Sequence, residues 1–385
     1  MGLRKGRELS AGLESLSLFS QFPAAPTGSD IQDMRSRQEV LDQLRDGMDE
    51  SLANEARLHG WRVQNMFQSV IVALGSVALI TMEDAGSFYY EDERGKLAQP
   101  DFRIVRRDGQ QLLVEVKNVG PRKSGEVGVR RSDLVSLQQY AELTHARLVY
   151  AHYWSGFNLW TLVDSSIFEP REGKMILEFS RAMSANEMSL VGDRSIGTRP
   201  PLTVSLVADA SKPRDSQSID DSTHQVSMVI GDVSISCEGR TLTSQTERDL
   251  AWFLAMYGTW PGEEVVHIDE DGRLDSMEMI FAPVEDDGTQ RRFELVGWLS
   301  SMHSMRYNVS TLTDSGRVRT LNSEAEPGSL AAMIPADYWD DSRRDLPIWQ
   351  VEVRPSIGPE AAAATTDGAQ GRPADSLAHQ ADEDI

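Results

Sequence analysis

Residues 100–117 read PDFRIVRRDGQQLLVEVK, and this stretch decides the fold of the chain. Apolar and polar side chains alternate over 101–105 and again over 111–117, which is the period of a β-strand. Asp108-Gly109 separates the two runs, and Asp-Gly between alternating runs is a strong hairpin signal. The sequence therefore predicts two antiparallel strands joined by a turn at Asp108-Gly109.

Three charged side chains meet in this hairpin. Glu115 and Lys117 are two residues apart on the second strand, so both point to one face of the sheet. Pairing of the strands brings Asp101 close to them. Two carboxylates and one ammonium can hold a divalent metal and activate a water for phosphodiester hydrolysis. The alternative is a surface hairpin with an ordinary ion pair, and the elements that flank the hairpin favour the site.

The flanking pattern is helix, three strands, helix, strand, strand. Apolar residues recur at helical spacing from Asp49, and Gly75 is a typical helix stop. A shorter polar helix precedes it, beginning at Ser29 or Asp30 and broken by Gly47. The remaining elements are strands over 77–82, 146–152 and 157–163, and a helix that begins at Ser132 or Asp133.

The hairpin resembles the PD-(D/E)xK nuclease superfamily. The motif reads Pro100-Asp101, thirteen intervening residues and then Glu115-Val116-Lys117, and the resemblance covers roughly residues 45–165. It implies a restriction-endonuclease-like α/β core, in which a central mixed sheet is flanked by helices. It also implies a metal-dependent endonuclease that hydrolyses phosphodiester bonds in DNA.

The resemblance assigns roles to individual residues. Asp101 and Glu115 would bind Mg²⁺, with Mn²⁺ as a substitute, and the backbone carbonyl of Val116 would add a third oxygen. Lys117 would act on the attacking water or on the charge that develops at the phosphate. Many family members add a carboxylate from the helix before the sheet. Here Glu55 is the preferred candidate and Glu50 is the alternative.

The charge pattern allows a nucleic-acid partner only locally. The whole chain carries a formal net charge of −22. Residues 100–150 carry nine basic and six acidic side chains, a local balance of +3. We expect phosphate contacts from the basic residues that follow the hairpin, and a polar contact from the next helix. These candidates are Arg122, Lys123, Arg130, Arg131 and Gln139.

Composition changes divide the chain into four parts. We expect a flexible arm over 1–28, the nuclease-like domain over 29–170, a mixed α/β accessory domain over 171–355 and a disordered tail over 356–385. The accessory domain has no recognisable catalytic motif, although a helix from Ser244 to Gly258 is well marked. Recognition or assembly suits it best, through a homodimer or a protein partner.

The sequence contains no feature that points to export or to a membrane. Cys237 is the single cysteine, so no intramolecular disulfide can form. The longest apolar run, Val70 to Ile80, is too short to span a bilayer. We therefore expect a cytoplasmic protein. Its two candidate functions are a DNA endonuclease of restriction, phage defence or repair, and a non-cleaving module that binds nucleic acid or a partner. The sequence leaves DNA versus RNA open.

Overall fold

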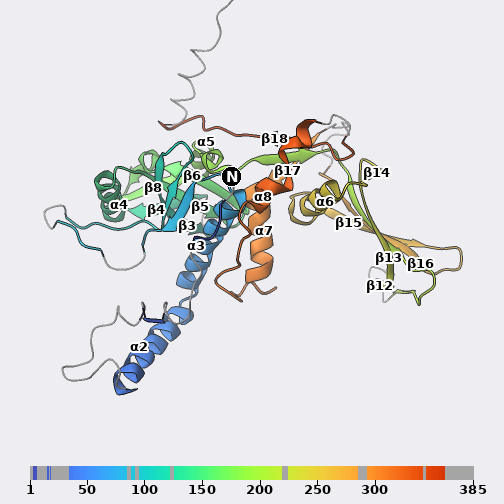
Figure 1. Cartoon of the computed structure of the whole chain (residues 1–385), viewed down its shortest axis with the longest axis horizontal. Coiled ribbons are helices and arrows are strands. Elements are labelled where there is room, and N and C mark those ends of the chain that lie inside the picture. The colour runs from blue at the N-terminus through green and yellow to red at the C-terminus, as the bar shows by residue number, and fades with distance from the viewer. Residues whose placement is uncertain are drawn as a thin grey trace, which may run out of the picture.

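The computed structural model describes residues 3–6, 15, 16, 18, 34–84, 88–91, 95–121, 125–218, 224–284, 293–340 and 344–359. The fold is mixed α/β, and its helices lie against several separate sheets (Figure 1). No helix among these residues is both long enough and apolar enough to cross a membrane.

Two helices open the described chain, α2 (Met34–Ala53) and α3 (Glu55–Leu74). The expected break at Gly47 is wrong, because α2 continues through this residue and ends at Ala53. Asn54 starts the next helix by accepting a hydrogen bond from the Arg57 amide at 3.1 Å, as an N-cap should. Gly75 ends α3 with a φ of 63°, the left-handed conformation that favours glycine, and this expectation is confirmed.

The central sheet has five strands in the order β1-β2-β3-β5-β6. The strands β3 and β5 are parallel and the other neighbours are antiparallel, so the sheet is mixed as predicted. The hairpin of β2 and β3 is confirmed, with Gly109 at a φ of 88° in its turn. The strand bounds are β1 (Leu79–Met82), β2 (Phe102–Val105), β3 (Gln111–Val119), β5 (Arg147–Trp154) and β6 (Leu159–Asp164).

The two faces of the central sheet pack against different helices. Leu112, Val114 and Val116 of β3 point to the core that contains the buried face of α3, which lies along the sheet (Figure 1). Leu113 and Val119 point to the opposite core, which contains the apolar face of α4 (Arg131–Leu143). The α4 helix crosses from β3 to β5, the connection that parallel neighbours require.

A small second sheet extends the N-terminal unit past residue 170. Its strands are β4 (Glu126–Arg130), β7 (Glu169–Arg171) and β8 (Lys174–Glu178), and β8 pairs with both of the others. The helix α5 (Phe179–Ser184) follows directly. The expected domain boundary at 170 therefore lies inside a sheet rather than in a linker.

The C-terminal half is also mixed α/β. One sheet has the order β14-β13-β10-β16-β15, and it reaches away from the rest of the molecule (Figure 1). The expected helix over 244–258 is confirmed as α6. The strands are β9 (Ser195–Thr198), β10 (Leu202–Ala208), β11 (Asp215–Ser218), β12 (His224–Ser227), β13 (Ile230–Cys237), β14 (Arg240–Thr241), β15 (Gly262–Ile268), β16 (Leu274–Phe281), β17 (Glu294–Trp298) and β18 (Trp349–Val351). The helices are α6 (Gln245–Tyr257), α7 (Leu299–Thr311) and α8 (Ser329–Met333), with short 3-10 turns at η2 (Ser165–Ile167), η3 (Met188–Val191) and η4 (Ala336–Asp340).

The helix α7 joins the two halves through buried polar contacts. Arg62 of α3 donates to the side-chain oxygens of Asn308 at 2.8 Å and Thr311 at 3.0 Å. A hydrogen bond of 2.9 Å joins the Ser69 hydroxyl to Nε2 of His303. One continuous apolar core also runs from α3 and the central sheet into α6, α7 and α8. The two halves are therefore packed as one body.

The described residues of the predicted arm (1–28) and of the predicted tail (356–385) contact the rest of the protein. Leu3 packs against the large core, and the Lys5 ammonium contacts Glu324 at 2.7 Å. Near the other end, the Ser356 amide donates to the carbonyl of Ser184 at 2.8 Å. The rest of the expected tail, 360–385, lies outside the described residues, as does most of the expected arm.

The buried imidazole of His303 should make stability depend on pH. Burial first, and then the charge of Arg306, lower the pKa of His303 from 6.5 to about 4. The unfolded chain takes up a proton near pH 6.5, whereas the folded protein takes it up only near pH 4, so stability is lost as the pH falls between these values. This contribution amounts to about 3 kcal/mol at most. Urea unfolding at pH 7 and pH 5 should show a smaller loss for His303→Gln than for the wild type. Equal losses would contradict the prediction.

Candidate active site

The strand β3 places Glu115 and Lys117 on the face of the sheet that α4 covers. They alternate with buried apolar neighbours and lie between Leu113 and Val119, which pack into the core on this side. The Lys117 ammonium donates to Oε1 of Glu115 at 2.5 Å. The Glu115 side chain is 14% exposed and that of Lys117 is 38% exposed. The pair therefore lies at the edge of the core and is open to solvent on the lysine side.

Asp101 lies just before β2, and its carboxylate is held from two sides. Oδ2 accepts from the backbone amide of Val116 at 2.6 Å, and Oδ1 accepts from the side-chain amide of Gln64 at 2.6 Å. Gln64 comes from α3, so one carboxylate ties the hairpin to the helix beneath the sheet. Asp101 itself is only 7% exposed. The structure thus brings Asp101 beside the strand that carries Glu115 and Lys117.

The backbone carbonyl of Val116 points to the side of β3 on which Asp101 lies. In an antiparallel ladder the N–H and C=O of one residue point to the same neighbouring strand. The Val116 amide points to Asp101, so its carbonyl points to that side as well. Continuing the register from the pair Phe102–Val114 sets Pro100 opposite Val116, and proline has no N–H to donate. The carbonyl of Val116 is therefore oriented toward the candidate site, without a backbone donor from Pro100.

The charges at the site are unbalanced. Burial first, and then the negative charge of Glu115, raise the pKa of Asp101 to about 8, although the Val116 amide and Lys117 act in the opposite direction. Burial lowers the pKa of Lys117, but attraction to Glu115 and the hydrogen bond with it outweigh this effect, so the net shift is upward. A single ammonium thus serves two carboxylates, and the site favours an additional positive charge.

The oxygen atoms present suit a small hard cation. Asp101 and Glu115 would supply carboxylate oxygens, and Val116 would supply a backbone carbonyl. In the described part of the chain, no three or more His, Cys, Asp or Glu side chains form a group that could hold a metal. Such a sparse set of protein ligands fits Mg²⁺, which keeps several of its waters and prefers oxygen.

The helix carboxylate predicted from the sequence is not at this site. Glu55 is exposed in the first turn of α3, and Glu50 is exposed on α2. Gln64 is the α3 residue that contacts Asp101, and it lies nine residues after Glu55, about 13 Å further along the helix axis. An amide therefore takes the place where a third carboxylate was expected. The sequence did contain a hint of this contact, because Gln64 follows Val63 and precedes Met66 on the apolar, buried part of α3.

The predicted nucleic-acid contacts are only partly described. Arg130 and Arg131 are exposed where α4 begins, and they make no ion pair with other described residues. The charge of Asp133, in the first turn of α4, acts on Lys117, so this end of the helix lies near the site. Gln139 is half-buried further along α4 and makes no hydrogen bond to the described site residues. Arg122 and Lys123 lie outside the described residues.

Several basic residues of the segment 100–150 form ion pairs with carboxylates inside the protein. Arg103 donates to both carboxylate oxygens of Glu83, at 2.6 and 3.0 Å, and the Tyr140 hydroxyl donates to Glu83 at 2.6 Å. The hydrogen bond from Arg103 is the largest cause of the lowered pKa of Glu83. Arg147 likewise contacts Asp164 at 2.7 Å. The local balance of +3 therefore overstates the charge that is open to a ligand.

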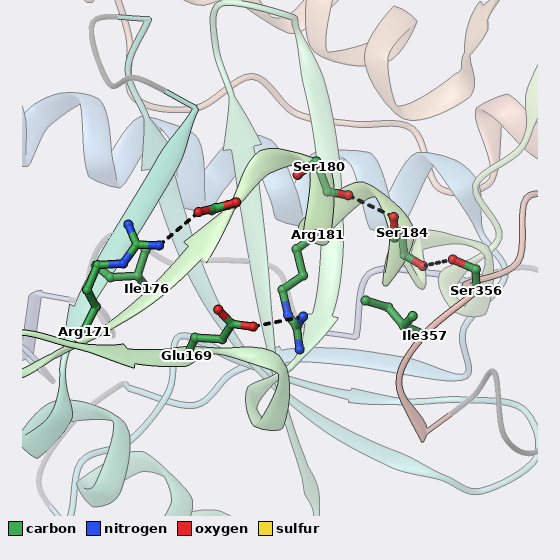
Figure 2. Close-up of a pocket in the computed structure, with 9 residues that line it drawn as sticks. Glu169, Arg171, Ile176, Ser180, Arg181, Ser184, Ser356 and Ile357 are labelled. Carbon is green, nitrogen blue, oxygen red and sulfur yellow. Dashed lines mark hydrogen bonds and ion pairs between the residues drawn. The ribbon is translucent and has the colours of Figure 1, made fainter.

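A pocket of about 360 Å³ lies elsewhere, between β7, β8, α5 and the C-terminal segment (Figure 2). Its charged side chains neutralise one another. Arg171 contacts Glu178 at 3.0 Å, and Arg181 contacts Glu169 at 3.0 Å. Ser356 closes one end by contacting Ser184 (Figure 2). Because its charges are paired and it contains none of the predicted site residues, we do not assign the active site to this pocket.

Comparisons with known proteins give a partial likeness to solved structures only. No protein-family model matches the chain, and no curated protein matches it. Among the solved structures that match is the 1.6 Å structure of Hjc, a Holliday junction resolvase of the archaeal hyperthermophile Archaeoglobus fulgidus. The two chains are 17% identical, the alignment covers 29% of this chain and 84% of Hjc, and the TM-score is 0.23. A likeness of this size decides nothing about the site, whose interpretation rests on the geometry above.

The Gln64 amide should contribute measurably to stability because it bonds a buried carboxylate. Gln64→Leu should lower the free energy of unfolding by about 1.5–3 kcal/mol, the usual range for hydrogen bonds to charged groups. Gln68→Leu is the matched control, because Gln68 is half-buried one turn further along α3 and makes no hydrogen bond with described residues. Urea unfolding at pH 9, above the pKa of about 8 for Asp101, measures both while the carboxylate is charged. An equal effect of the two substitutions would show that the contact with Asp101 contributes nothing.

Proposed function

We propose that the chain is a metal-dependent nuclease that hydrolyses phosphodiester bonds in DNA. The observation that carries the proposal is the buried Asp101 carboxyl group beside the Glu115–Lys117 pair, where two acidic groups share one ammonium and the second is held ionised only at a cost. A site of this kind gains from a divalent cation and from an anionic substrate that binds with the cation.

Each residue of the site then has a distinct role. Asp101 and Glu115 would hold Mg²⁺, or Mn²⁺ in its place, and the carbonyl of Val116 would complete the protein's oxygen ligands. The cation would supply Lewis acidity to the phosphate and to the attacking water. Lys117 is partly exposed and carries three N–H donors, so it can turn to contact a phosphate oxygen when substrate binds. Its positive charge would stabilise the negative charge that develops in the transition state.

The surroundings suggest how nucleic acid is held. Arg130 and Arg131 lie at the end of α4 nearest Lys117 and would contact the phosphate backbone, with Arg122 and Lys123 as further candidates. Gln139 would be a weaker contact. Restriction, phage defence or repair in the cytoplasm would suit such an enzyme. The C-terminal half would serve recognition or assembly, in a homodimer or with a protein partner.

A second candidate function is a nuclease-like module that binds nucleic acid or a protein without cutting. One observation favours it, because Gln64 rather than a carboxylate contacts Asp101. A site with two carboxylates binds a cation less strongly than a site with three. The complete Asp101, Glu115 and Lys117 set favours the enzyme.

The nuclease proposal predicts metal-dependent cleavage that requires Lys117. Purified protein should cut supercoiled plasmid or single-stranded DNA in Mg²⁺ or Mn²⁺ and not in EDTA. Lys117→Ala and Asp101→Asn should each lower the rate by at least about 100-fold, because each removes a group that acts in the transition state. Lys212→Ala, an exposed lysine in the turn after β10, should cut at the wild-type rate.

The same assay separates the two candidate functions. A protein that binds DNA but never cuts it, in either metal, would be the binding module. Cleavage that survives in Lys117→Ala would place the active site elsewhere. RNA substrates in parallel reactions would settle which nucleic acid is preferred.

Arg131 should act as a phosphate contact rather than as a reader of sequence. Binding of the inactive Lys117→Ala protein to a fluorescent duplex is measured at several salt concentrations in EDTA. Adding Arg131→Ala should weaken binding on all sequences alike and reduce the slope of log affinity against log salt by about 1. Arg240→Ala, exposed on β14, is the control and should leave the slope unchanged. An unchanged slope in Arg131→Ala would remove this residue from the interface.

A further inference from the structure

Tyr150 of β5 is buried with its hydroxyl unused. The residue is 1% exposed, and its hydroxyl has no hydrogen-bond partner in the part of the chain that the structure describes. A buried polar group without a partner is costly, so native proteins usually satisfy such groups or use them for function. This hydroxyl therefore calls for an explanation.

Other buried tyrosines of the protein do find partners. The hydroxyl of Tyr307 donates to the carbonyl of Leu321 at 2.9 Å, and that of Tyr338 donates to the carbonyl of Leu346 at 2.6 Å. The fold can therefore provide a hydrogen-bond acceptor for the hydroxyl of a buried tyrosine. The unused hydroxyl at position 150 is a local property of the sheet beside the candidate site.

The register of the sheet places Tyr150 beside Glu115. The two residues are direct partners in the parallel pair of β3 and β5, so their side chains share one face. The ring of Tyr150 packs against Phe168 at 4.9 Å between centroids, in an edge-to-face arrangement. This packing fixes the direction of the ring, and the hydroxyl remains in a region where the charges of Glu115, Asp133 and Asp101 are felt.

The phenol is a hydrogen-bond donor in this position. Burial first, and then the three carboxylates, raise the pKa of Tyr150 above its ordinary value, so the proton stays in place. In the structure Lys117 donates to Glu115 at 2.5 Å. Lys117 must turn toward the phosphate to perform its proposed role, and Glu115 then needs another donor to keep its orientation.

We propose that Tyr150 is the positioning residue for Glu115, donating to its carboxylate when Lys117 engages a phosphate. This inference rests on the proposed nuclease function for its purpose, but not for its geometry. It gives the hydroxyl the partner that it lacks in the structure: the contact with Lys117 holds the Glu115 carboxylate in an orientation that leaves the phenol without a partner, and this contact is released when Lys117 engages a phosphate. Tyr150 acts through Glu115 and does not touch the substrate.

A double-mutant cycle with Lys117 tests the contact without any activity assay. In the wild-type background, Tyr150→Phe should leave the melting temperature unchanged or raise it, because it removes an unsatisfied hydroxyl. In the Lys117→Ala background Glu115 is free to accept from Tyr150, so adding Tyr150→Phe should lower the melting temperature. The sign of the effect thus changes between backgrounds. The same shift in both backgrounds would overturn the proposal.

Kinetics supply the second test. Tyr150→Phe should lower kcat about tenfold, equivalent to 1.36 kcal/mol, and leave KM unchanged, because substrate binding does not involve the hydroxyl. Tyr338→Phe is the matched control: it should lower the melting temperature by leaving the Leu346 carbonyl unpaired, and keep the wild-type kcat. A wild-type kcat in Tyr150→Phe would overturn the role of Tyr150. If the wild-type protein cuts no nucleic acid, the proposed function fails, and the cycle still decides whether Tyr150 supports Glu115.

Discussion

The hydrogen bond from the Val116 amide to the Asp101 carboxylate is the interaction on which the site depends. It forms where Pro100 interrupts the pairing of β2 with β3, since proline cannot donate to the ladder. The carboxylate thereby becomes buried and requires further support, which Gln64 provides from α3. The Asp101 side chain thus bonds the hairpin where its ladder ends and joins the hairpin to α3. The Val116 carbonyl points to the same side of β3 as the Val116 amide, toward Asp101. The position of the site follows from this single constraint.

The two faces of the central sheet have different roles: one is packed into the core, and the other carries the charged pair. The face toward α3 is part of an apolar core that continues into the C-terminal half, with Arg62 and Ser69 bonded to α7. The opposite face carries Glu115 and Lys117 next to α4. Because the first face is fixed by helices from both halves, the strand that carries the charged pair is held rigidly. A well-held strand is what a site needs to keep charged groups within hydrogen-bond distance of a substrate.

Local features were predictable from the sequence and non-local ones were not. The hairpin follows from alternation around Asp108-Gly109, which needs only neighbouring residues. The sequence favoured Glu55 over Glu50, and Gln64 was missed, because the turn of α3 that lies beside Asp101 is not fixed by the helical period alone. The boundary at 170 failed to separate two units because β4 pairs with β8 across some fifty residues of chain. Gly47 lies inside α2 because a glycine costs a helix only about 1 kcal/mol, and the capping side chain of Asn54 marks the true end.

The acidity of the chain limits how the proposed nuclease could bind nucleic acid. Arg103 and Arg147 neutralise carboxylates inside the protein, so counting charges along the segment exaggerates its attraction for phosphate. Arg130 and Arg131 remain open, and two phosphate contacts supply only a small part of the affinity that DNA-binding proteins draw from counterion release. The net charge of −22 opposes long-range attraction between the chain as a whole and a phosphate backbone. A nuclease built on this chain must therefore gain affinity from elsewhere: from cations bound at Asp101 and Glu115, or from a second copy or partner that shares the substrate. This requirement gives the large C-terminal half a physical reason to be packed against the sheet that carries the site.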